Sequence, residues 1–199
     1  MVGELLALVS FAFVGTVTPG PNNTLLWASG LRFGFQRTLP HIIGTSLGIG
    51  SEVLGVAGGI GALLATLPGA ELALKVAGSA YLLWLAFRIA GGRTAGPGAR
   101  GIISRPLGLW QAVTFQYANP KAWLFAIAAV GAFLPPRPSH LVGVAVLTSM
   151  LMVVVVASAA IWAAGGAVLN RVAGNPRTHR AVSIALATLL AASIALIWV

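Results

Sequence analysis

The sequence predicts an all-α membrane protein with six transmembrane helices, arranged as two inverted three-helix repeats in which helices 1 and 4 are broken. Hydrophobic residues make up 58% of the chain and charged residues only 8%, unlike the composition of a soluble domain. Six apolar runs follow one another, each near or above the roughly 20 residues that cross a membrane. Two of these runs contain helix-breaking prolines. We therefore expect one transmembrane domain over residues 1–199 and no separate water-soluble domain.

Turn-rich or basic segments separate the apolar runs. The first and fourth runs contain the breaks, the second contains an acidic residue and regularly spaced glycines, and the others are uninterrupted. The glycine-rich connection after the third run is flexible by composition and is expected to tether the two halves. The runs cover residues 5–31, 42–67, 72–90, 107–134, 141–169 and 181–199.

Basic residues predict the orientation of the helices. Lysine and arginine accumulate on the cytoplasmic side of membrane proteins. The opposite side holds only Lys75 and Arg137. We therefore expect both termini to lie outside. For the arginines on the predicted cytoplasmic side, we expect contact with anionic lipids in preference to substrate binding. The arginines on the predicted cytoplasmic side are Arg32, Arg37, Arg88, Arg93, Arg100, Arg105, Arg171, Arg177 and Arg180.

An offset near 100 residues relates the two halves, because it places Pro21 opposite Pro120 and Arg37 opposite Arg137. Repeat one would cover about residues 1–92 and repeat two about residues 105–199. Each half has an odd number of spans, so the second half must cross the membrane in the opposite sense to the first. From the helical rise, both breaks lie about 20 Å from the face where their span enters, at mirror-related depths.

The first break, Thr18-Pro19-Gly20-Pro21-Asn22-Asn23, is a candidate substrate site. Proline removes a backbone donor and disturbs the preceding turn, so the helix is expected to unwind here. Within a membrane, the freed backbone groups are tolerated only inside protein or beside a wet cavity. A half-helix that begins near Pro21 would offer its positive end to a carboxylate. The alternative is a kinked structural helix capped by Thr18 or Asn22.

The second break repeats this design in the fourth run. Gln111 and Gln116 precede it and are candidates to line the same cavity. A lysine inside a span is costly unless it is paired or hydrated, so Lys121 is predicted to be functional. Its alternative is to extend to the outer interface along its flexible stem. The predicted substrate-binding residues of this break are Tyr117, Asn119, Pro120 and Lys121.

Glu52 lies about 15 Å into the second run, near the middle of the membrane. Four glycines share its helical face, which is therefore expected to pack against another helix. Removal from water favours the neutral acid, so Glu52 is a candidate for proton coupling or for binding an ammonium group. A neutral acid hydrogen-bonded between helices is the alternative, and the first two glycines could also form a homodimer face. The glycines are Gly44, Gly48, Gly55 and Gly59.

The sequence predicts no metal site, cofactor, nucleic-acid partner or enzymatic activity. It has no cysteine, which excludes disulfides and thiolate chemistry. His41, His140 and His179 lie in separate connections or at the ends of runs, and are expected at the membrane interface. The spans contain no acid pair, nucleophile elbow or phosphate-binding loop.

Several motifs together resemble the LysE/RhtB superfamily of bacterial amino-acid exporters. They are Thr18-Pro19-Gly20-Pro21-Asn22, Gly30-x-Arg32-x-Gly34, Gly44-x-x-x-Gly48 and Asn119-Pro120-Lys121-Ala122. Residues 80–86 and Phe115-Gln116 look most like the cysteine and O-acetylserine exporter branch. Many family members carry an acid directly after the second glycine, where this chain has Ile49 and Glu52 follows one turn later. The resemblance implies a six-helix exporter of the bacterial inner membrane, driven by the proton gradient.

Together these observations give the hypothesis of secondary active export of a small neutral or polar amino acid by alternating access. The substrate carboxylate would bind at residues 19–23 and near Asn119, while Glu52 takes the ammonium group or the coupling proton. Export of another amino acid, such as homoserine or threonine, lysine or arginine, or leucine, is an alternative. A membrane channel or an assembly protein is another.

Overall fold

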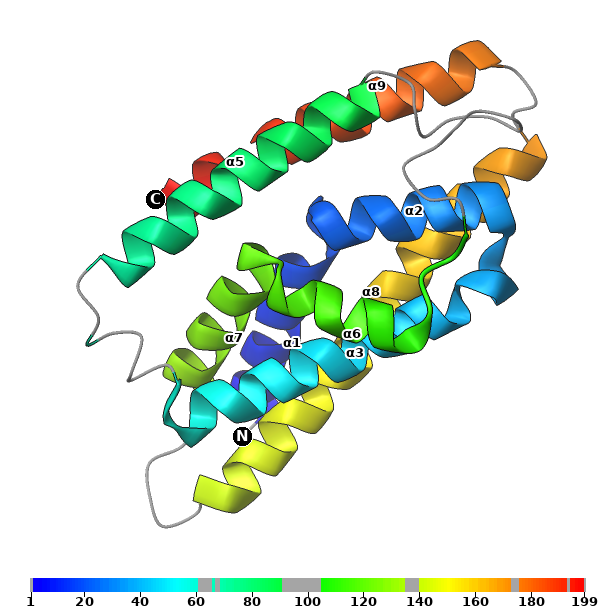
Figure 1. Ribbon diagram of the computed structural model, residues 1–199. Coiled ribbons are helices and arrows are strands. Elements are labelled where there is room, and N and C mark those ends of the chain that lie inside the picture. The colour runs from blue at the N-terminus through cyan, green and yellow to red at the C-terminus, as the bar shows by residue number, and fades with distance from the viewer. Residues whose placement is uncertain are drawn as a thin grey trace.

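The computed structural model describes residues 2–60, 66, 69–90, 105–134, 140–172, 176–192 and 194–198. This part of the chain is helical and contains no strand (Figure 1). The helices are α1 Val2–Val17, α2 Pro21–Phe33, α3 Phe35–Gly55, the short π-helix η1 Val56–Ile60, α5 Ala70–Ala90, α6 Leu109–Tyr117, α7 Pro120–Phe133, α8 His140–Val172, α9 Pro176–Ala192 and α10 Ala195–Trp198.

Several of these helices suit a membrane. Residues Phe35–Gly59 and Leu141–Arg171 are each long and apolar enough to cross one. The pair α1 and α2 adds a third span if it is taken as one helix bent by 65°. The all-helical, apolar prediction is therefore confirmed for the described residues, while the six-helix inverted repeat stays a prediction.

Both predicted helix breaks are present at the predicted prolines. α1 ends at Val17, Gly20 has an extended backbone, and Pro21 is the first residue of α2. α6 ends at Tyr117, Asn119 is extended, and Pro120 begins α7. Proline suits the first position of a helix because its missing N–H would have no partner there.

Two further interruptions occur at glycines with positive φ. The sequence placed a connection at residues 32–41, which includes Gly34, but it did not predict the interruption at Gly59. Gly34 has φ 82° and separates α2 from α3, so α3 begins at Phe35 and not near Ile42. Gly59 has φ 113° in η1, and no described atom lies within 4 Å of the position that its Cβ would occupy. Among the described residues, no helix therefore packs against Gly59. Its backbone conformation, which glycine adopts readily, bends the end of this helix.

The main core lies where α1, α3, α7 and α8 meet. Small residues bring these helices and α6 close together, as is common in membrane proteins. A Cβ at Gly44 would lie 2.3 Å from the Leu109 carbonyl oxygen, and one at Gly48 would lie 2.7 Å from Gln116 Cγ. The Gly44 and Gly48 face is thus covered by α6 of the same chain, which leaves it no room for the homodimer contact considered above. The buried residues of the main core are Leu8, Ala12, Ile49, Val53, Val56, Ala122, Phe125, Ala126, Ala129, Leu147, Leu151 and Val155.

Helices α5 and α9 form a separate layer beside this core. They lie side by side along their lengths in Figure 1 and share a small apolar cluster around Leu82 and Leu190. The layer meets the rest of the protein at the second break, because a Cβ at Gly78 would lie 2.5 Å from the Pro120 ring. Pro120 therefore serves as a packing surface for α5.

Candidate functional site

The two helix breaks meet through Lys121. Its Nζ donates hydrogen bonds to the Thr18 carbonyl oxygen (2.7 Å), to Thr18 Oγ1 (2.8 Å) and to the Pro19 carbonyl oxygen (3.3 Å). The side chain is half-buried and points at the first break. Extension of Lys121 to the membrane interface, which the sequence left open, is not the arrangement observed.

The carbonyl oxygens of the first break all have hydrogen-bond donors, as a buried backbone requires. Trp162 of α8 supplies one of these donors, and no sequence pattern had indicated it. The donors come from α2, α7 and α8, so the break is held in a defined shape. The bonds run from Asn23 Nδ2 to Thr16 O (2.6 Å) and Thr18 O (2.9 Å), from Trp162 Nε1 to Val17 O (3.1 Å), from Lys121 Nζ to Pro19 O (3.3 Å) and from Thr24 N to Gly20 O (3.0 Å).

Asn22 is the centre of a buried polar network that joins α2, α3 and α6. Its Oδ1 lies 3.1 Å from His41 Nε2 and 3.2 Å from Thr45 Oγ1, and it accepts from Gln116 Nε2 at 2.9 Å. Gln116 Oε1 in turn accepts from Asn119 Nδ2 at 3.1 Å. The network therefore links residues of both breaks through side chains that are shielded from solvent.

A cavity of about 40 Å³ lies between the two breaks and α8. Gly20, Pro21, Asn22, Asn23, Asn119 and Lys121, which the sequence assigned to a substrate site, line it. Val155, Ser158 and Ala159 supply the α8 wall. Thr18 and Pro19 do not line the cavity and instead hold Lys121 in place.

The starts of α2 and α7 make this cavity rich in donors. The first N–H of α2 that bonds within its own helix is that of Thr24, to Gly20 O. The N–H groups of Asn22 and Asn23 precede it and so have no intrahelical acceptor. In α7 the same holds for the N–H of Lys121, because Ala122 makes the first such bond, to Asn119 O. These N–H groups, the two positive helix ends and the Lys121 ammonium favour an anionic group.

Tyr117 lies outside the cavity. Its ring is 47% exposed and its hydroxyl donates to Ser51 Oγ at 2.8 Å. Successive residues of a helix point about 100° apart, so the turn that places Gln116 in the buried network directs Tyr117 outward. The Tyr117 carbonyl accepts from Trp123 Nε1 at 3.0 Å and helps to close the second break.

Glu52 is buried on α3 but does not line the cavity. Both of its carboxyl oxygens lack a hydrogen-bond partner among the described residues. An unpartnered acid in such surroundings is expensive, which is typical of functional groups in membrane proteins. The hydrogen-bonded structural role considered as an alternative has no partner in this part of the chain.

His41 and Thr45 belong to the network, although the sequence had not predicted a role for either. His41 is fully buried inside α3, and not in a connection or at the end of a run as the sequence predicted. The error follows from the start of α3, since the residue lies near the second turn of a helix that begins at Phe35. A signal was available in the spacing of His41, Thr45, Gly48 and Glu52, which recur at intervals of three and four residues on one helical face.

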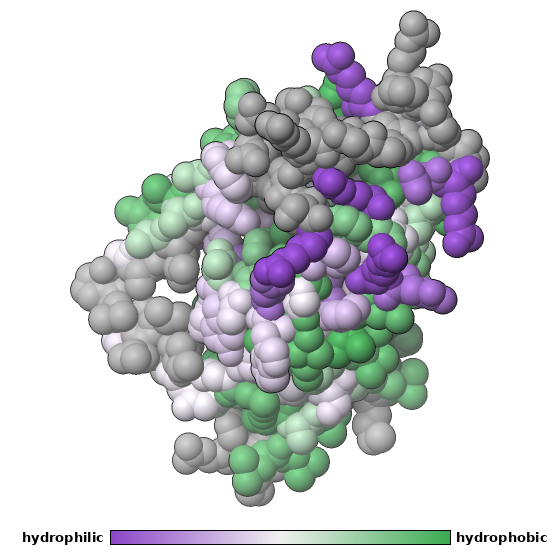
Figure 2. All heavy atoms as spheres, turned by 45° about the vertical axis from the view of Figure 1, so that its right-hand side comes forward, coloured by the Kyte–Doolittle hydropathy of each residue, from purple (hydrophilic) through white to green (hydrophobic). Residues whose placement is uncertain are grey.

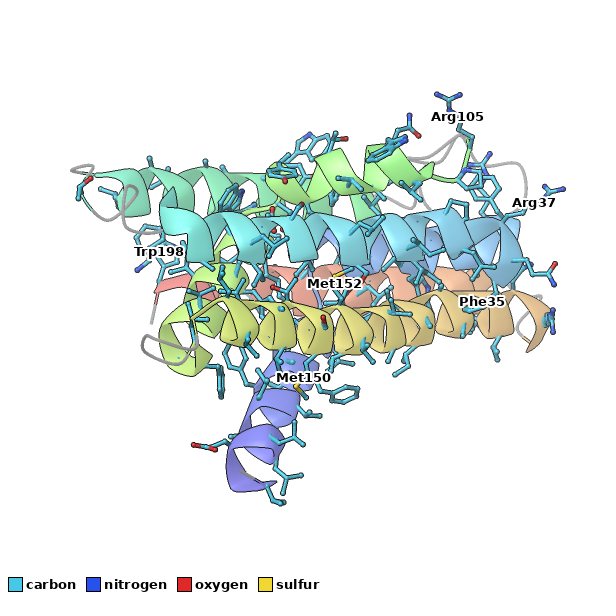
Figure 3. All side chains as sticks on the ribbon, turned by 90° about the horizontal axis from the view of Figure 1, so that it is seen from below. Phe35, Arg37, Arg105, Met150, Met152 and Trp198 are labelled. Carbon is cyan, nitrogen blue, oxygen red and sulfur yellow. The ribbon has the colours of Figure 1, made fainter. Side chains whose placement is uncertain are left out.

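Arginines whose side chains the structure describes gather at one end of the molecule. Figure 3 shows Arg37 and Arg105 together at the end opposite to Trp198. Hydrophilic side chains collect in the upper right of Figure 2, and hydrophobic ones cover much of the remaining surface in view. Arg32, Arg171 and Arg180 are exposed as well. Arg93, Arg100 and Arg137 lie outside the described residues.

Comparison with known proteins is consistent with this architecture. A family model described as "LysE type translocator" matches residues 13–197. The chain is 33% identical over 150 residues to the cysteine/O-acetylserine efflux proteins of Escherichia coli (strain K12), Shigella flexneri serotype 5b (strain 8401) and Shigella sonnei (strain Ss046). Each match covers 74% of this chain and 75% of the relative. No solved structure matches it. The chain is thus a membrane protein that belongs to the family of LysE type translocators.

Proposed function

We propose that this protein exports a small neutral or polar amino acid, similar to cysteine or O-acetylserine, by proton-coupled alternating access. The observation that carries the proposal is the Lys121 bond to the first break beside a cavity lined by the starts of α2 and α7. An α-carboxylate fits these donors because the ammonium group, the N–H groups at the starts of α2 and α7 and the helix ends all favour negative charge.

The position of the cavity supports a moving carrier. The two breaks line it together with α8, and a carrier has to open such a site to each side of the membrane in turn. The two breaks are the natural places for this movement, since they divide two spans into half-helices that meet at the cavity. Their relation as repeat mates, one in each half of the chain, is part of the proposal.

The substrate class is proposed from the relatives. The proteins that match this chain are named for efflux of cysteine and O-acetylserine. Both molecules are small and carry an α-carboxylate and an α-ammonium group. Export of another amino acid, such as homoserine or leucine, is the alternative, because the lining of the cavity does not identify the side chain of the substrate.

Glu52 is proposed as the proton-coupling residue. It is a buried acid without a hydrogen-bond partner among the described residues, on the helix that also carries His41 and Thr45 of the network. Inward movement of one proton provides about 2.3 kcal/mol per 100 mV, enough to accumulate a zwitterion roughly fifty-fold.

The proposed location is the inner membrane of a bacterium, with the arginine-rich end in the cytoplasm and both termini outside. This orientation makes the cytoplasm the side that faces the exposed arginines of α2, α3 and α8. Contact with anionic lipid at this end follows from the same charges. A homodimer remains a further proposal, which requires a face other than Gly44 and Gly48.

The proposal is tested with purified protein in liposomes. A panel of labelled amino acids is loaded inside, and efflux is measured with and without an imposed proton gradient. We expect saturable efflux of a small subset that includes cysteine or O-acetylserine, accelerated by the gradient. Flux that does not saturate would support a channel, and gradient-driven transport of lysine or arginine alone would overturn the proposed substrate class.

A further inference from the structure

The side chain of Asn119 does not perform the role that its position suggests. Asn119 is the residue before α7, where asparagine commonly accepts hydrogen bonds from the first N–H groups of a helix. Its side chain makes no such capping bond. Instead its Nδ2 donates to Gln116 Oε1 at 3.1 Å, away from the α7 backbone. The amide is therefore held for a purpose other than ending the helix.

Hydrogen-bond direction fixes which end of this amide is free. Asn22 Oδ1 accepts from Gln116 Nε2, so Gln116 presents its oxygen to Asn119. Asn119 must then present its nitrogen to Gln116. An amide oxygen has two lone pairs. Gln116 Nε2 donates to Asn22 Oδ1, and His41 Nε2, 3.1 Å from the same oxygen, donates to it in the tautomer that carries the Nε2 hydrogen. Thr45 retains its bond to the His41 carbonyl oxygen, at 2.9 Å. Hydrogen-bond donation therefore runs in one direction, from the Asn119 nitrogen to Gln116 and from the Gln116 nitrogen to Asn22.

This direction leaves Asn119 Oδ1 as a buried acceptor with no donor among the described residues. An unmet buried acceptor destabilises the protein, so a group that restores its hydrogen bond should bind favourably. Asn119 is 4% exposed and lines the cavity. Ser158, whose hydroxyl is likewise buried without a partner in this part of the chain, lines the same cavity from α8.

The cavity therefore presents two kinds of polar group. Lys121 and the N–H groups of Asn22 and Asn23 are donors, whereas Asn119 Oδ1 is an acceptor. An α-amino acid carries a matching pair, an acceptor carboxylate and a donor ammonium on one carbon. Glu52, the other candidate for the ammonium group, does not line the cavity.

We propose that Asn119 Oδ1 accepts the substrate's ammonium group, and that Gln116 is the positioning residue that turns the Asn119 amide to do so. The proposal rests on the proposed function, and it assigns the two ends of the substrate to different residues. It also separates the ammonium site from Glu52, which is left to the proton alone.

Three small thiols test the two ends of the substrate separately. L-Cysteine has both charged groups, 3-mercaptopropionate lacks the ammonium group, and cysteamine lacks the carboxylate. Each is used as an unlabelled competitor of labelled L-cysteine counterflow in liposomes. No gradient is imposed, so a membrane potential does not alter the apparent affinities of the two analogues that carry a net charge. We expect the wild-type protein to prefer L-cysteine to 3-mercaptopropionate by about 10- to 100-fold, from one charge-assisted hydrogen bond.

The Asn119→Leu variant removes the acceptor at nearly constant size. We expect it to reduce the preference for L-cysteine over 3-mercaptopropionate to within about threefold, while discrimination against cysteamine is retained. Asn119→Asp keeps an acceptor and should keep the preference. Gln116→Met should reduce it partially, because the Asn119 amide is no longer held. Asn170→Leu, at an exposed position of α8, is the control for the same change and should match the wild type.

The outcomes separate this inference from the proposed function. If the wild-type protein shows counterflow with neither L-cysteine nor labelled O-acetylserine, the proposed substrate is wrong. If counterflow occurs and Asn119→Leu keeps the full preference for the ammonium group, the assignment of Asn119 is overturned. A uniform loss of affinity for all three thiols would show a structural role only, and would also overturn it.

Discussion

Lys121 places a positive charge among membrane helices, where an ammonium group is tolerated only with hydrogen-bond or charge partners. It has them in Thr18 and Pro19 of the other break, at 2.7 to 3.3 Å. The sequence predicted a functional lysine from its depth, and the contact explains how its charge is accommodated. What depth could not predict is the partner, which lies 103 residues earlier in the chain.

We expect Lys121→Met to weaken substrate binding by about 10- to 100-fold, because the variant keeps the stem but loses the charge-assisted hydrogen bonds to a carboxylate. Counterflow affinity for L-cysteine measures this. Lys121→Arg should recover part of the loss, and Lys75→Met on α5 is the matched control. An unchanged affinity would remove Lys121 from the substrate site.

The Glu52→Gln variant should insert normally and still exchange substrate, but its efflux should no longer respond to an imposed proton gradient. Glutamine has nearly the same shape as glutamic acid but cannot take up or release a proton. Efflux with and without the gradient, compared with gradient-free exchange of the same preparation, is the measurement. If the gradient accelerates the variant as it does the wild type, Glu52 does not carry the coupling proton.

At the scale of the elements, close contact between helices depends on glycines at positions where a Cβ would collide with the neighbouring helix. The regular spacing of Gly44 and Gly48 predicted a packing face, but spacing alone could not distinguish contact with α6 from contact with a second copy. It also included Gly59, whose positive φ interrupts the helix. The sequence located the two proline breaks well because proline disturbs the helix at its own position. The start of α3 depends on the positive φ of Gly34, and a hydropathy pattern does not report the backbone conformation of a glycine.

We expect Gly44→Ala to lower the free energy of unfolding by about 1–3 kcal/mol. Its Cβ would lie 2.3 Å from the Leu109 carbonyl oxygen, so α3 and α6 must separate. At this chain length the change corresponds to a fall in Tm of roughly 2 to 12 °C. Thermal unfolding in detergent measures it. Gly131→Ala is the control because no described atom lies within 4 Å of its Cβ position, and an equal fall in both variants would contradict the packing explanation.

At the scale of the whole molecule, the exposed arginines of the described residues mark one end and Trp198 lies toward the other (Figure 3). Hydropathy predicted the apolar helices, and charge predicted an uneven distribution of arginine. Neither predicted that α5 and α9 form a layer of their own, because that arrangement depends on which apolar faces fit together. Contacts such as Gly78 with Pro120 are matters of shape, which single-sequence patterns do not encode.

The predicted orientation can be tested with introduced thiols, since the chain has no cysteine of its own. We expect Gly3→Cys, near the N-terminus, to react in intact cells with a maleimide that does not cross membranes. Arg37→Cys, at the arginine-rich end, should react only after permeabilisation. The reverse pattern would contradict the outward termini.

The Lys121 contact has a kinetic consequence. The Lys121 ammonium group, which is proposed to bind the substrate, already donates to three oxygens of the first break. Without substrate, these hydrogen bonds hold the two breaks together. A carboxylate that takes over the lysine releases the break, whereas an unloaded protein must release it without compensation. The return of the empty carrier should then be the slow step of the cycle, and one-for-one exchange should run faster than net efflux at equal substrate concentration.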